Sequence, residues 1–117
     1  MRHLSKLVLA CAVGAGCASA PVPQAKIDGV SKAISSASDA VGTQGGVAAE
    51  RLADAKKWFD SAQELAKAGK TDAALSTLAK SDADAKLAQA LGVEGSARAQ
   101  LASVQDQIKA LKAQLGK

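Results

Sequence analysis

The chain has 117 residues, of which 48% are hydrophobic and only 2% aromatic, and it carries a formal net charge of +4 at pH 7. Its basic side chains are spread along the chain among acidic ones. This argues against a nucleic-acid surface, because such surfaces need clustered cations or aromatic platforms for base stacking. A chain of this length forms one small domain, and its Ala-rich composition favours helix.

The first 16 residues have the layout of a secretory signal peptide. Arg2 and Lys6 flank the start of an apolar run from Leu7 to Ala15, and this run ends in small residues. The run is too short to span a bilayer as a helix, because crossing the hydrocarbon core takes about 20 residues. We therefore expect residues 1–16 to be removed on secretion.

The residues at the end of this run, Gly14-Ala15-Gly16-Cys17, resemble the lipobox of bacterial lipoproteins, although lipoboxes usually carry Leu where this chain has Gly14. The resemblance implies that the sulfur of Cys17 receives diacylglycerol and that cleavage makes this cysteine the new N-terminus. The competing site, Ala18-Ser19-Ala20, would require cleavage before Pro21, whose ring constrains the peptide bond. We expect no cofactor, only this covalent lipid on Cys17, with palmitate-type acyl chains.

Two cysteines in a secreted chain also fit a disulfide. That alternative is disfavoured, because cleavage before Cys17 removes Cys11. Once acylated, Cys17 would hold the protein on a membrane, since two acyl chains suffice for stable anchoring. By resemblance to the sorting rule of bacterial lipoproteins, Ala18 after the cysteine favours the periplasmic face of the outer membrane.

Residues 17–26 are expected to form the lipidated N-terminus and a tether, because Pro21 and Pro23 disfavour helix. A helical domain is expected over residues 27–117. Three glycines within residues 42–46 predict a flexible loop after its first helix. That helix is indicated by apolar residues at spacings of three and four, namely Ile27, Val30, Ile34, Ala37 and Val41.

A helical hairpin is expected over about residues 47–91. Its first arm ends near Ala68, where Gly69 is suited to the left-handed conformation that closes a helix. Thr71 or Asp72 is expected to cap the second arm. So short a loop makes the two arms antiparallel neighbours. The seam residues are Ala48, Leu52, Ala55, Phe59, Ala62 and Ala66 in the first arm, and Ala74, Leu78, Ser81, Ala85 and Ala88, widened by Leu75, Leu87 and Leu91, in the second.

The C-terminal segment, over about residues 96–115, shows a heptad pattern of apolar residues. Gly92 and Gly95 precede it and predict a break or a kink, with a continuous helix as the alternative. Such a stripe needs a partner, and two stay open: the hairpin, which the segment would complete into a bundle, or a second copy in a coiled coil. The candidate interface residues are Leu101, Val104, Ile108, Leu111 and Leu115.

Together these elements predict an all-α fold. It consists of an antiparallel helical hairpin, extended to a small three- or four-helix bundle, with a coiled-coil-like C-terminal helix. Roughly from Val47 to Leu115, the chain resembles the uncharacterised domain family DUF 4398, which occurs in bacterial envelope lipoproteins, often ahead of a coiled-coil extension. The residues that carry the resemblance are Leu52, Ala55, Phe59, Ala62, Gly69, Ala74 and Asp84-Ala85-Lys86-Leu87-Ala88. The chain departs from the pattern at Ser81, where the family favours Ala.

The residues after the signal offer no catalytic constellation. His3 leaves with the signal and acylation would consume the thiol of Cys17, so acid–base and nucleophilic chemistry lack their usual groups. Asp82 and Asp84 are two residues apart and do not face each other on a helix, whereas Lys86 lies at i+4 from Asp82. We expect neither an enzyme nor a metal site.

These features favour an outer-membrane lipoprotein with a structural or scaffolding role, exerted through helix–helix contacts with itself or with another envelope protein. An adaptor or accessory subunit of an envelope machine is the alternative. A minor alternative rests on Lys117, because in the murein-linked outer-membrane lipoproteins that the chain resembles at its two ends a C-terminal lysine is joined to peptidoglycan. The simpler interpretation of Lys117 is a solvated cation at a helix end.

Overall fold

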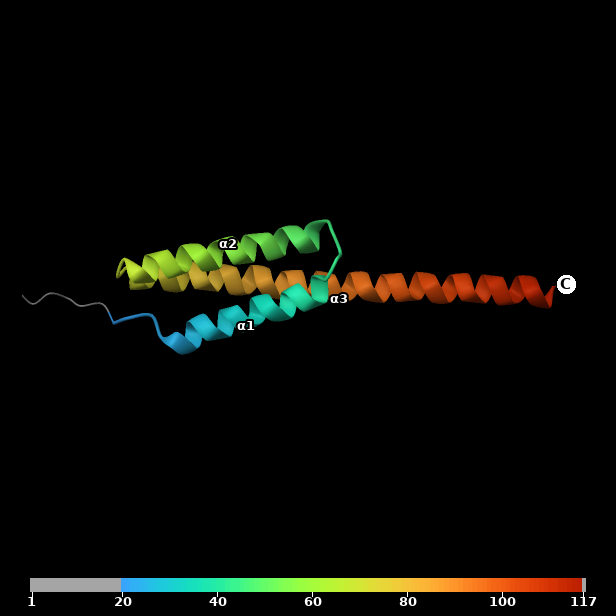
Figure 1. The fold of residues 1–117 in the computed structure, drawn as a ribbon, viewed down its shortest axis with the longest axis horizontal. Coiled ribbons are helices and arrows are strands. Elements are labelled where there is room, and N and C mark those ends of the chain that lie inside the picture. The colour runs from blue at the N-terminus through green and yellow to red at the C-terminus, as the bar shows by residue number, and fades with distance from the viewer. Residues whose placement is uncertain (1–19, 117) are drawn as a thin grey trace, which may run out of the picture.

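The computed structural model describes residues 20–116, and these residues form three helices and no strand. The helices are α1 (Gln24–Val41), α2 (Val47–Lys67) and α3 (Thr71–Leu115). α1 and α2 lie along the first half of α3, with α2 antiparallel to the other two, and the rest of α3 continues beyond them (Figure 1). The expected all-α fold and antiparallel hairpin are confirmed, and α1 completes a three-helix bundle.

α1 begins directly after Pro23, three residues before the predicted start at Ile27. Pro23 has an extended backbone (φ −59°, ψ 130°) and is compatible with a helix start, because the first N–H groups of a helix have no intrahelical partner. Residues 24–26 therefore belong to the helix and not to the tether. The predicted stripe is confirmed, since Val30, Ala37 and Val41 are buried.

The turn between α2 and α3 closes as the sequence predicts, but α3 begins differently. Gly69 has φ 73°, and the N–H of Lys70 donates to the carbonyl of Leu65 at 2.9 Å, which satisfies a carbonyl at the end of α2. The predicted cap of α3 by Thr71 or Asp72 is wrong, because Lys70 is the cap residue and makes no side-chain cap. The hydroxyl of Thr71 instead donates to the carbonyl of Ala20 at 2.8 Å.

α3 is one continuous helix of 45 residues, so the segments predicted at about 47–91 and 96–115 are not separated by a break. Gly92 is buried, and a Cβ atom on it would lie 2.6 Å from the carbonyl oxygen of Ala40. The glycine is needed for the close approach of α1 to α3. The end of α1 is fastened there by Gln44, whose side-chain amide donates to the carbonyl of Gly92 at 3.0 Å and to the hydroxyl of Ser96 at 2.9 Å.

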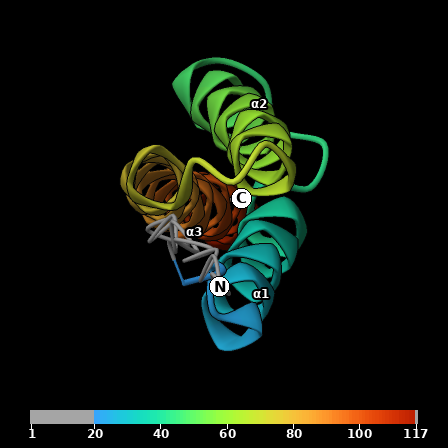
Figure 2. The same cartoon turned by 90° about the vertical axis from the view of Figure 1, so that its left-hand side faces the viewer.

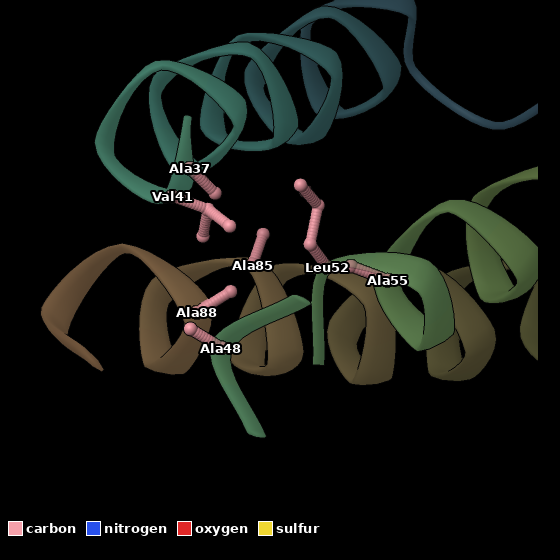
Figure 3. Close-up of a cluster of buried hydrophobic side chains, with 7 residues drawn as sticks. All are labelled: Ala37, Val41, Ala48, Leu52, Ala55, Ala85 and Ala88. Atoms are coloured by element: carbon pink, nitrogen blue, oxygen red, sulfur yellow. The ribbon is translucent and has the colours of Figure 1, made fainter. Parts of the chain in front are cut away.

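The core of the bundle is built mainly from small side chains. Close packing of three helix backbones is possible because alanine adds little bulk between them. Ser81 is fully buried with its hydroxyl donating to the carbonyl of Ala55 at 2.7 Å, so this polar group is satisfied. The larger of two clusters (Figure 3) contains Ala37, Val41, Ala48, Leu52, Ala55, Ala85 and Ala88. The other contains Val30, Ala62 and Leu78, with Phe59 half-buried against it.

α1 and α2 both lie on one side of α3. The view along the molecule shows the three helices at the corners of a triangle, with the opposite side of α3 uncovered (Figure 2). The buried residues of α3 agree, because they recur at spacings of three and four and so share one face of the helix. They are Ala74, Leu78, Ser81, Ala85, Ala88 and Gly92.

Candidate helix–helix interface

The C-terminal part of α3, residues 93–115, is here called the α3 extension. All five candidate interface residues lie on it and are 45–86% exposed; together they form the apolar stripe, Leu101, Val104, Ile108, Leu111 and Leu115. The hypothesis that this segment packs on the hairpin to complete the bundle is wrong, because α1 takes that place. The stripe has no partner within residues 20–116.

The apolar stripe faces away from the bundle. Leu101 follows Gly92, the last buried residue of α3, by nine residues, which is about 2.5 turns of an α-helix. A half-integral number of turns puts the two residues on opposite sides of the helix. α3 therefore presents one face to α1 and α2 along its first half, and the opposite face carries the stripe along its second half.

The exposed apolar surface also extends back along the bundle. Leu87 and Val93 are 45% and 58% exposed, and Leu87 lies two heptads before Leu101. The prediction that Leu87 belongs to the core seam is wrong. The signal that identifies it was present, since its spacing of 14 residues from Leu101 places both on one face of a continuous helix. The uncovered face of α3 thus carries large apolar side chains on both sides of Glu94, at Leu87 in the bundle and along the apolar stripe in the extension.

Four charged residues of the extension pair within their own helix. Arg98 donates to the carboxylate of Glu94 at 2.6 Å, and Lys109 lies 3.7 Å from Asp106. All four side chains are more than half exposed, and ion pairs of this kind contribute little to stability. None of these four charged residues belongs to the apolar stripe.

A second surface feature lies between α1 and α3 near the start of both helices. It is a groove of about 710 Å³ with an apolar floor, and nothing in the sequence patterns indicated it. Gly29 lies at this groove, and a Cβ there would meet no atom within 4 Å. The residues lining the groove include Gly29, Val30, Ala33, Leu75 and Leu78, together with Lys26, Lys32 and Lys86.

Asp82 and Asp84 form separate ion pairs. The carboxylate of Asp82 accepts from Lys86 at 2.5 Å, as predicted, while Asp84 lies 3.9 Å from Arg51 of α2. Across residues 20–116, His, Cys, Asp and Glu side chains do not gather in threes at any point where they could hold a metal ion. Among the same residues no helix combines the length and hydropathy needed to cross a membrane.

Two predicted sites lie outside the described residues. They are the lipidation site Cys17, within the lipobox-like segment, and the candidate peptidoglycan attachment at Lys117. No family model, curated protein or solved structure matches the chain. The resemblance of the hairpin to DUF 4398 therefore stays a prediction from its residue pattern.

Proposed function

We propose that this chain is a lipid-anchored protein of the periplasmic face of the outer membrane, where it acts as a structural element through helix–helix contacts. The observation that carries the structural role is the apolar stripe on the α3 extension. Five large aliphatic side chains aligned on one face of an unpartnered helix cost free energy in water, and such surfaces mark sites of protein association.

The arrangement of the helices supports a role at a distance from a membrane. The carbonyl of Ala20 is bonded to Thr71, so the chain enters the bundle beside the first residue of α3. α3 has 45 residues and is about 67 Å long at 1.5 Å per residue. A lipid on Cys17, three residues before Ala20, would leave the apolar stripe at the end of α3 that points away from the anchor.

The bundle gives this arrangement its rigidity. Gln44 joins the loop after α1 to Gly92 and Ser96, at the point where the bundle ends and the extension begins. Since α3 has no break at this point, the extension is a direct continuation of a packed helix. A rigid arm of this kind suits a scaffold, because it holds its contact surface in a fixed orientation.

The anchor is tested by growing cells with a clickable fatty acid and comparing three full-length forms. The unchanged chain and Cys11→Ala are expected to incorporate the label and fractionate with the outer membrane, and Cys17→Ala is expected to lose the label. A labelled Cys17→Ala variant, or an unlabelled protein free in the periplasm and starting downstream of residue 17, would overturn the proposed anchoring.

The scaffolding role is tested by crosslinking in cells followed by mass spectrometry. Crosslinks through the apolar stripe are expected either between copies or to several envelope proteins. A single dominant heterologous partner that is lost in a Leu101→Asp variant would contradict scaffolding and favour an adaptor subunit.

A further inference from the structure

We infer that the partner of the apolar stripe is the same segment of a second copy, and that the two α3 extensions pair in parallel and in register over residues 97–115. This inference rests on the proposed function, because it names the partner of the surface on which that function depends. The pairing would be a short two-stranded coiled coil with Ala97, Leu101, Val104, Ile108, Leu111 and Leu115 as its seam.

A second copy has room to approach along the whole seam. α1 and α2 lie on the side of α3 opposite the apolar stripe, so neither bundle obstructs a helix laid along that stripe (Figure 2). In a parallel pair the two bundles stand side by side at the same end. That arrangement matches two chains that enter their bundles from one membrane, since Ala20 lies at the start of α3 in each.

The residues flanking the seam favour the parallel arrangement. One flank carries Arg98, Gln105 and Lys112, and the other carries Gln100, Gln107 and Gln114. In a parallel pair unlike flanks meet, so glutamines face glutamine or lysine and no like charges are opposed. In an antiparallel pair with the seams fully overlapped, each flank meets its own kind, and Arg98 of one helix faces Lys112 of the other.

Glu94 fixes the register of the pair. It lies one heptad before Leu101, where the next seam residue would be, and it is ion-paired with Arg98 at 2.6 Å. Sliding one helix by a heptad would set the Glu94 carboxylate against Leu101 of the other helix and leave Leu115 without a partner. Because removing a carboxylate from water into an apolar layer is costly, the in-register pairing that keeps Glu94 outside the seam is preferred.

The pairing is expected to depend on concentration. The seam spans fewer than three heptads, and short coiled coils of this length associate weakly. Confinement of both copies to one membrane raises their effective concentration and strengthens an interface without any new contact. Lipid anchoring and pairing therefore reinforce each other, although either can be measured without the other.

The test uses two matched cysteine variants of the full-length chain in a Cys11→Ser background, treated in isolated envelopes with a short bis-maleimide. Ala97→Cys lies on the seam and Ala99→Cys lies on the opposite face, and both positions are exposed. Ala97→Cys is expected to give covalent dimers at a yield at least tenfold above Ala99→Cys. In an antiparallel pair the two residues at position 97 would be about 27 Å apart along the axis, too far for the reagent.

Second-site substitutions and the identity of the crosslinked residues decide the outcome. Adding Val104→Asp to Ala97→Cys is expected to abolish the dimer, whereas adding Ser103→Asp on the opposite face is expected to leave it. A crosslink of Ala97→Cys to Leu115→Cys but not to itself would overturn the parallel arrangement. Equal yields from Ala97→Cys and Ala99→Cys, no dimer at all, or crosslinking to a different protein alone would overturn self-pairing.

Repeating the crosslinking with Cys17→Ala separates this inference from the anchoring. The substitution removes the native thiol as a source of crosslinks, and dimers are expected in purified protein at high concentration. Dimers from Cys17→Ala, together with a failure of the unchanged chain to incorporate fatty acid, would leave pairing intact and overturn the anchor. Full labelling of the unchanged chain with no dimer from either form would leave the anchor intact and overturn pairing.

Discussion

The two halves of α3 use apolar residues in opposite ways. In the bundle half all the buried residues except Leu78 are small, and seven of the eleven buried hydrophobic residues of the described chain are alanine. In the extension the apolar face carries Leu, Val and Ile, and seven of the eight exposed large hydrophobic residues lie on α3. The bundle is therefore stabilised by close approach of helices, while most of the large aliphatic surface is left available for association.

The largest expected effect is a difference in unfolding free energy between one substitution in the bundle half of α3 and one in the extension. Leu78→Ala removes a side chain that is 4% exposed and is expected to lower the free energy of unfolding by about 2–5 kcal/mol, because it leaves a cavity in the bundle. Leu111→Ala, on the extension, is expected to change it by less than about 0.5 kcal/mol in the monomer. Urea denaturation followed by circular dichroism at low protein concentration measures both.

Equal losses from Leu78→Ala and Leu111→Ala in dilute monomer would contradict the comparison, because the extension would then contribute to the folded core. At high protein concentration we expect Leu111→Ala to have the larger effect on association, although Leu78→Ala has the larger effect on stability. Leu111→Ala is expected to weaken dimer formation measured by sedimentation, and Leu78→Ala is expected to leave the interface itself unchanged.

The next effect concerns glycines in two helices. Gly92→Ala would bring a Cβ atom to 2.6 Å from the carbonyl oxygen of Ala40, and the resulting displacement of α1 is expected to cost about 1–3 kcal/mol of unfolding free energy. Gly29→Ala meets no atom within 4 Å and is expected to stabilise α1 by about 0.5–1 kcal/mol. In thermal unfolding, Gly92→Ala is expected to lower Tm and Gly29→Ala to raise it. A gain of stability in both variants would rule out the close approach at Gly92.

A smaller effect is expected at the junction between the two halves of α3. Gln44→Ala removes the hydrogen bonds to Gly92 and Ser96, and at about 0.5–1.5 kcal/mol for each bond it is expected to cost about 1–2 kcal/mol. Hydrogen exchange should accelerate for amides at the end of α1. Gln114→Ala on the exposed extension is the matched control, and no acceleration in Gln44→Ala relative to it would show that the loop does not fasten the bundle.

Most of the fold was predictable because its signals are local. Apolar spacings of three and four located the buried stripe of α1 and the two seams of the hairpin, and a glycine at position 69 located the turn. The start of α1 was predicted too late because proline disfavours helix, although a proline can occupy the position directly before a helix, as Pro23 does. The five residues of the apolar stripe were also identified from spacing alone.

The remaining features depend on contacts between distant residues. In the sequence Gly92 predicts a break in the helix. Its role in the structure is to let α1 approach α3 closely, and this depends on Ala40, which is 52 residues earlier. The 14-residue spacing of Leu87 from Leu101 indicates its exposure only if α3 is continuous, and that continuity involves the packing of Gly92 against Ala40 of α1. The groove beside Gly29 arises from the separation of α1 and α3, which spacing does not encode.

The smallest expected effect tests whether the bundle half depends on shape or on its one buried hydroxyl. Ser81→Ala removes the 2.7 Å hydrogen bond to the carbonyl of Ala55, at a typical cost of about 0.5–1.5 kcal/mol. Because Ala55 lies inside α2, its carbonyl keeps its helical partner, and alanine favours helix more than serine does. The net loss of unfolding free energy, measured by urea denaturation, is therefore expected to stay below about 1 kcal/mol.

Ser81→Val adds volume at a position that is fully buried, and it is expected to cost about 1–3 kcal/mol of unfolding free energy. If Ser81→Ala were the more damaging of the two, the hydrogen bond and not the close fit of small residues would hold α2 against α3.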